Sequence, residues 1–87
     1  MTRSAAEPLV ELTVDEVGDR TRAIARMDWQ DGTLVGVGHT RPTELLPDRA
    51  ARTLAVSRAL SDLATRLADH ARVGAAQRRA DAGDLRR

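Results

Sequence analysis

Histidine, serine and cysteine most often carry catalysis or bind metal, and in this sequence they are few and poorly placed for either role. His39 and His70 lie far apart in the chain, without the His-x-x-x-His spacing of a metal site, and there is no cysteine to complete a ligand set. Ser57 and Ser61 are not in the glycine-flanked turn that presents a nucleophilic serine. We therefore expect a protein that is not an enzyme and that uses no metal or cofactor.

Arginine is the other residue type that could bind a ligand, because its guanidinium pairs with phosphate. All 14 basic residues are arginine, and 13 acidic residues nearly balance them. Residues 1–47 carry 5 arginines and 8 acidic residues, a net charge of −3, whereas residues 48–87 carry 9 and 5, a net charge of +4. Polyanions would therefore bind the C-terminal half.

Nucleic-acid binding is one of two functional hypotheses. Arg49 and Arg52 lie where a helix is predicted to begin, and a helix N-terminus favours anions. These two arginines and the basic tail are the predicted phosphate contacts for duplex RNA or DNA, with Arg22 and Arg26 as additional cations. Against this hypothesis, Trp29 is the one aromatic residue that could stack on a base, and it is predicted to face the core. We therefore rank protein partners above nucleic acid.

Two alternating segments predict β-strands. In residues 9–14, Val10, Leu12 and Val14 share one face, and polar residues share the other. Residues 20–29 alternate without a break, and their outer set is polar apart from one isoleucine. The predicted core-facing set of this second strand is Ala23, Ala25, Met27 and Trp29.

The loop before the third strand sets the register of the hairpin. A three-residue loop over 30–32, with its glycine left-handed, would bring Val35 opposite Met27. A two-residue loop would shift the pairing by one and put Gly36 and Gly38 on the core face. Because core positions are normally apolar, the sequence favours the longer loop.

Residues 48–71 predict one long amphipathic helix. Asp48 suits the N-cap position, and apolar residues recur every three or four positions after it. The stripe predicted to pack on the sheet is Val56, Ala59, Leu60, Leu63, Ala64, Leu67, Ala68 and Ala71. The helix is longer than an eight-residue strand and should extend beyond the sheet.

Together these elements predict an α+β fold, in which a three-stranded antiparallel sheet packs against one long amphipathic C-terminal helix. We place a single domain at residues 9–73, after a flexible arm (1–8) and before a frayed helix or disordered tail (74–87). There is no apolar leader and no run of ~20 apolar residues that could cross a bilayer. With no cysteine as well, we expect a cytoplasmic protein without a membrane partner.

The outer face of the sheet is the predicted protein interface. In the predicted register it holds two apolar side chains, two arginines and two glycines that leave a shallow depression. The set is Arg22, Ile24, Arg26, Leu34, Gly36 and Gly38. Apolar surface without cover favours a partner, so the first hypothesis is an interaction module that binds a second copy or another protein. The end of the helix around Leu67 and Ala71 is the next candidate.

Several short segments together point to a known family. They are Asp19-Arg20-Thr21-Arg22-Ala23, Ala25-Arg26, Trp29, Val35-Gly36-Val37-Gly38 and Arg58-Ala59-Leu60-Ser61-Asp62-Leu63-Ala64. In this order they resemble a family of short actinobacterial proteins, a domain of unknown function described as having a double-stranded-RNA-binding-like fold. The resemblance covers roughly residues 8–70. It implies the α+β fold and no activity.

Overall fold

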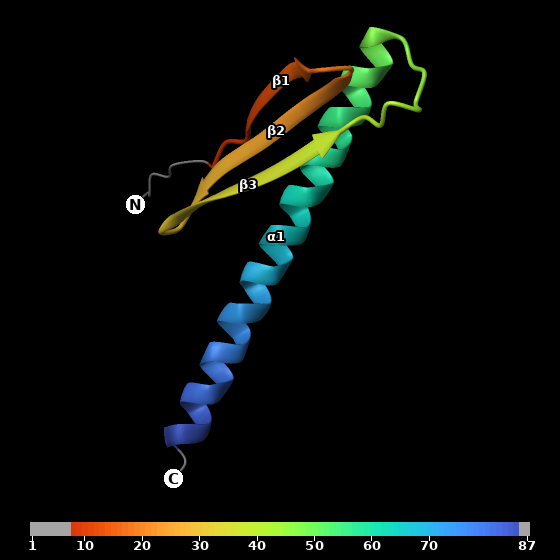
Figure 1. Cartoon of the computed structure of the whole chain (residues 1–87). Helices are drawn as coiled ribbons and strands as arrows, with labels where there is room; N and C mark the ends of the chain where they lie inside the picture. Colours follow the sequence, from red (N-terminus) through yellow and green to blue (C-terminus); the bar gives the residue numbers. More distant parts are fainter. Residues whose placement is uncertain (1–7, 86–87) are drawn as a thin grey trace.

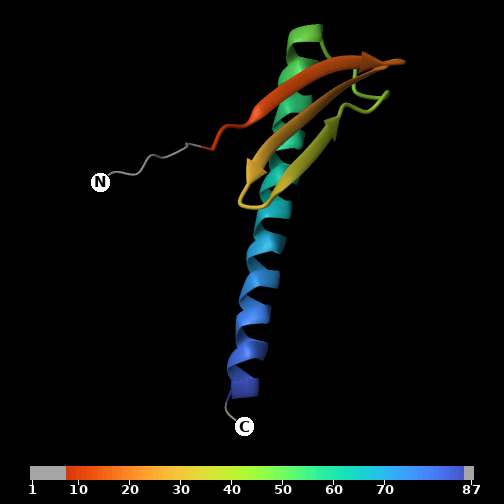
Figure 2. The same cartoon turned by 90° about the vertical axis from the view of Figure 1, so that its left-hand side faces the viewer.

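The computed structural model describes residues 8–85, with side chains through residue 75. Three strands, β1 (Glu11–Val17), β2 (Arg20–Trp29) and β3 (Gly32–His39), form an antiparallel sheet in the order β1-β2-β3. One helix, α1 (Asp48–Leu85), lies across one face of this sheet (Figures 1 and 2). The predicted α+β architecture is confirmed. The predicted arm at 1–8 lies outside the described residues except for its last position.

The helix extends far beyond the sheet (Figure 1). Its 38 residues span about 57 Å, whereas the ten residues of β2 span about 33 Å. The radius of gyration is 18.0 Å, against about 12 Å for a compact chain of this length. The segment predicted as a frayed helix or tail from residue 74 onward belongs to the same helix through Leu85. Within residues 8–85, no helix is both long and apolar enough to cross a membrane.

The β2–β3 hairpin has a two-residue loop, Gln30 and Asp31, because Gly32 already pairs with Trp29. The three-residue loop that the sequence favoured is therefore wrong. The positive φ of this loop is at Gln30 (55°) and not at the glycine. A left-handed glutamine is uncommon, so the sequence pattern pointed to Gly32 instead.

This register turns the glycines of β3 inward. Gly36 pairs with Ala25 and Gly38 pairs with Ala23, and all four residues are buried against α1. A Cβ atom at Gly36 would overlap the carbonyl oxygen of Ala59 in the helix backbone. The glycines thus let the backbone of α1 approach β3 directly. Apolar side chains alone would favour valines at these inward positions of β3. The close approach of the helix backbone requires glycines instead.

The core between sheet and helix consists mainly of small residues. It contains four alanines and two larger side chains: Ala23, Ala25, Met27, Ala55, Ala59 and Leu63. On α1 the buried positions recur every fourth residue. The buried face of the helix is therefore narrower than the apolar stripe predicted from the sequence. Leu60 is 40% exposed, and Ala64, Ala68 and Ala71 are exposed as well. The helix therefore buries one narrow line, Ala55, Ala59 and Leu63, and leaves most of its other apolar residues partly or fully exposed.

Candidate interaction surface

The outer face of the sheet carries half of the predicted interface. Arg22, Ile24 and Arg26 lie on it, as predicted. Leu34, Gly36 and Gly38 do not, because the two-residue loop places them on the side of α1. Their positions on the outer face are taken by Val35 (38% exposed) and Val37 (36%), of which Val37 pairs with Ile24. The outer face is therefore more apolar than the sequence predicted.

Arg22 on this face is bound to the neighbouring strand. It pairs with Asp15 of β1, and its Nε and Nη2 donate to the two carboxylate oxygens at 3.2 and 2.9 Å. These hydrogen bonds hold the pKa of Asp15 below its usual value. The guanidinium of Arg22 is therefore already engaged by a carboxylate, which weakens its predicted role as a phosphate contact.

Two side chains of α1 cover part of the edge of β3. Asp62 accepts a hydrogen bond from the backbone N–H of Val37 (2.9 Å), and Arg58 donates to the carbonyl of His39 (2.9 Å). The Val37 N–H, together with Arg66, lowers the pKa of Asp62. Unpaired groups on an edge strand can add a further strand, and these two contacts block that addition over 37–39.

Arg58 also anchors the loop that joins β3 to α1. Its Nη1 and Nη2 each donate to the Glu44 carboxylate at 2.8 Å. The same carboxylate accepts a hydrogen bond from the backbone N–H of Arg41 at 2.6 Å. The hydrogen bonds from Arg58 and Arg41 lower the pKa of Glu44 to about 2. The same arginine thus fixes the strand end, the loop and the helix relative to one another.

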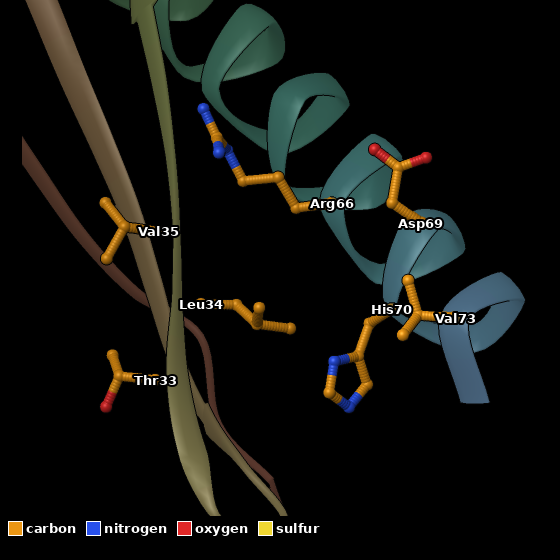
Figure 3. Close-up of a pocket in the computed structure, with 7 residues that line it drawn as sticks. All are labelled: Thr33, Leu34, Val35, Arg66, Asp69, His70 and Val73. Atoms are coloured by element: carbon orange, nitrogen blue, oxygen red, sulfur yellow. The ribbon is translucent and has the colours of Figure 1, made fainter. Parts of the chain in front are cut away.

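A cleft of about 480 Å³ lies between β3 and α1, beyond the covered part of the edge (Figure 3). In Figure 3, Leu34 points toward α1, whereas Thr33 and Val35 point to the other side of the strand. The charged groups in the cleft are paired with neighbours on their own helix: Arg66 with Asp62, and Asp69 with Arg72. His70 lies 3.4 Å from the side chain of Gln30. The cleft therefore offers no converging set of reactive groups.

The remaining polar groups are spread over separate parts of the molecule. Among the side chains of residues 8–75, no cluster of three or more histidine or acidic side chains could hold a metal ion. Arg49 and Arg52 are exposed in the first turns of α1. Arg49 borders a depression whose other lining residues include Pro47, Ala50 and Leu54, so most of that surface is apolar. Because the helix and the outer face lie on opposite sides of the sheet, the predicted arginine set is not brought together.

A second surface lies where α1 leaves β1 uncovered, and the sequence predicted only its end, around Leu67 and Ala71. The helix contacts β3 and β2 far more than β1. Val56 and Leu60 are each two residues from Arg58, which places them roughly 160° around the helix from it. Arg58 reaches the edge of β3, so these two residues lie on the opposite flank, toward β1. Five apolar residues follow this β1-side flank of α1: Val56, Leu60, Ala64, Leu67 and Ala71.

On β1, Leu12 faces the same open space. Leu12 pairs with Ala25, which pairs with Gly36, and Gly36 lies directly beneath Ala59. Leu12 therefore lies on the same side of the sheet as α1, on the strand toward which this flank of the helix faces. The side chains of Leu12 and Leu60 are 45% and 40% exposed. On the flank, Leu60, Ala64 and Ala71 are exposed, whereas Val56 and Leu67 are half-buried.

Comparisons with known proteins agree with the resemblance found in the sequence. The model of the Rv2632c-like family matches residues 7–82. Uncharacterized protein Rv2632c of Mycobacterium tuberculosis is 40% identical over 60 residues, and uncharacterized protein Mb1767 of Mycobacterium bovis is 42% identical over 60 residues. Each match covers 67% of this chain and 64% of the relative.

A solved structure shows the same architecture. The crystal structure of Rv2632c matches with a TM-score of 0.76 and 30% identity, over 88% of this chain and 94% of that chain. The names of these relatives state no activity, in agreement with a family of unknown function. The description of the fold as double-stranded-RNA-binding-like stays a prediction. The chain belongs to the Rv2632c-like family.

Proposed function

We propose that this protein is a non-enzymatic interaction module of the cytoplasm that associates with itself. The observation that carries the proposal is the distribution of large apolar side chains. Among the described residues, Met27 and Leu63 are the two that are buried, whereas ten are exposed. The exposed set is Leu9, Val10, Leu12, Val17, Val35, Val37, Leu45, Leu46, Leu60 and Val73. A domain that buries so little of its large apolar surface favours a partner that covers the rest.

The area of the molecule supports the same proposal. Its accessible surface is 6729 Å², whereas a compact monomer of 9.4 kDa exposes about 5,000 Å². The excess follows from the elongated shape, in which α1 extends past the sheet. It exceeds the ~800 Å² that each partner contributes to a standard interface, so the molecule has room for one.

The test is the solution mass by light scattering with size-exclusion chromatography, over a range of concentrations. We expect a species of at least twice the chain mass of 9.4 kDa at high concentration. A mass of one chain at every concentration up to the millimolar range would contradict self-association.

Phosphate binding through Arg49 and Arg52 is tested in parallel, because the exposed guanidinium groups of these residues have no side-chain partner among the described residues. Titration of duplex RNA at several salt concentrations would show steep salt dependence if phosphate contacts release counterions. We expect no specific binding. Submicromolar affinity at physiological salt, lost in the variant Arg49→Ala/Arg52→Ala, would instead make nucleic acid the partner.

A further inference from the structure

We propose that the self-association surface is the β1-side flank of α1, and that it packs antiparallel against the same flank of a second copy. This inference rests on the proposed function and names its interface. The flank is apolar over four turns, from Val56 to Ala71, and carries no charged residue along its line. On the outer face of the sheet, by contrast, arginine side chains stand beside the apolar residues. Such mixed faces are ordinary solvent-facing sides of antiparallel sheets.

The order of large and small residues along the flank is self-complementary. A two-fold axis between Thr65 and Arg66 places Leu60 opposite Ala71 of the second copy. The same axis places Leu67 opposite Ala64 of the second copy. Each leucine thus meets an alanine, in both directions, and the alternation of large and small side chains lets two helices interdigitate closely. A parallel arrangement would set leucine against leucine and alanine against alanine.

The length of α1 gives the second copy a place to sit. The part of the helix beyond residue 74 extends past the sheet (Figure 2). A helical segment without tertiary contacts is only marginally stable in water. In the antiparallel pair, this extension of one helix runs beside residues 48–56 of the second helix. Each copy thereby contacts the part of its partner's helix that the partner's own sheet does not reach.

The second helix would also cover the exposed leucine of β1. Leu12 lies on the same side of the sheet as α1 and on β1, the strand toward which the flank faces. Its 45% exposure would fall on association. Pairing of β1 with β1 of a second copy is the less favourable alternative, because it would bring Glu11 near Asp15 or Glu16 of the other strand.

Cysteine cross-linking tests the contact directly, because the natural chain has no cysteine. The variants Leu60→Cys and Ala71→Cys are mixed, allowed to exchange subunits and oxidised mildly, and mass spectrometry separates the three linked species. We expect the mixed pair to exceed both self-linked pairs several-fold. The control replaces Ala71→Cys with Ala68→Cys, which lies roughly 180° around the helix from the buried Ala59 and should give no excess.

Solution mass separates this inference from the proposed function. In Leu60→Glu we expect a folded protein with the mass of one chain, whereas Leu45→Glu, at a loop position that is 92% exposed, should keep the mass of the natural protein. Circular dichroism establishes that both variants are folded. If the natural protein associates but Leu60→Glu does so equally, or if self-linked Leu60→Cys dominates, the proposed interface is wrong and self-association stands on another face. If the natural protein is monomeric, the proposed function itself fails.

Discussion

Gly36 shows how a missing side chain determines the packing of this domain. Its backbone lies against the backbone of α1, so that an added Cβ would also stand 2.5 Å from the amide nitrogen of Leu63. Neither the strand nor the helix backbone can yield as a flexible side chain would. The glycine is therefore required by the close approach of the helix, although its own φ is not in the left-handed region.

The substitution Gly36→Ala should destabilise the fold, because its single methyl group must displace the helix. Overpacked sites typically cost about 1–3 kcal/mol, and occasionally more. Urea unfolding of this variant measures the loss. The matched control is Gly32→Ala, where an added Cβ meets no atom within 4 Å, and where we expect little change. If Gly36→Ala had the same free energy of unfolding as the natural protein, the helix would not pack on β3 as described.

Glu44 is the residue whose ionisation should matter most for acid stability. Hydrogen bonds from Arg58 and Arg41 lower its pKa from 4.5 to about 2. A carboxyl with a lower pKa in the folded than in the unfolded state stabilises the fold above the unfolded pKa. That contribution is lost as the pH falls from about 5 through 2.

We therefore expect Glu44→Gln to lower the urea midpoint at pH 7 and to approach the natural protein as the pH falls below 4. Measurement of the midpoint at several pH values between 7 and 2 follows this convergence. Glu16→Gln, which removes a β1 carboxylate with no ion pair among the described residues, should instead leave the midpoint at pH 7 little changed. A constant difference between Glu44→Gln and the natural protein down to pH 2 would contradict the assigned role.

At the level of the elements, the edge of β3 depends on the helix that follows it. Asp62 and Arg58 are four residues apart, so they project from the same side of α1 toward the strand. Together they satisfy one N–H and one carbonyl that an edge strand would otherwise expose. The helix thereby limits the pairing of β3 with other chains, while it also packs on the inner face of the sheet.

Removal of the Asp62 carboxylate should open this edge locally. In Asp62→Ala the amide of Val37 loses its acceptor, so we expect its hydrogen exchange to accelerate several-fold, as measured by NMR. Asp62→Asn retains an acceptor oxygen and should keep most of the protection. Equal exchange rates in the natural protein and Asp62→Ala would mean that this hydrogen bond does not form in solution.

The elements could be predicted from the sequence, but their faces only in part. Alternation in 20–29 and the periodicity after Asp48 are strong local signals, so the order of three strands and one helix was predicted correctly. The first strand, however, lies at Glu11–Val17 and not at 9–14. The register of β3 depends on a left-handed Gln30 and on a helix backbone pressed against Gly36, which no local pattern indicates. The wrong register placed Leu34, Gly36 and Gly38 on the outer face of the sheet, where the structure has Val35 and Val37. The flank of α1 was missed in part for a different reason, because the periodicity of the helix alone places Leu60 on the face that packs on the sheet.

For the whole molecule, the narrow core and the elongated shape limit how much stability one copy can have alone. Most of the buried hydrophobic side chains are alanines, so the hydrophobic contribution from burial within one copy is small. The large apolar residues lie on surfaces that a second copy can cover. Association and folding should therefore be coupled, since binding that selects the folded state raises its apparent stability.

The dependence of thermal stability on protein concentration tests this account most directly. Melting curves followed by circular dichroism over a hundredfold range of concentration should shift to higher Tm as the concentration rises, because the associated folded state is favoured by mass action. Leu60→Glu should lose that dependence and melt at the Tm that the natural protein approaches on dilution. A Tm of the natural protein that is independent of concentration across this range, with a single-chain mass throughout, would contradict self-association as the function of the domain.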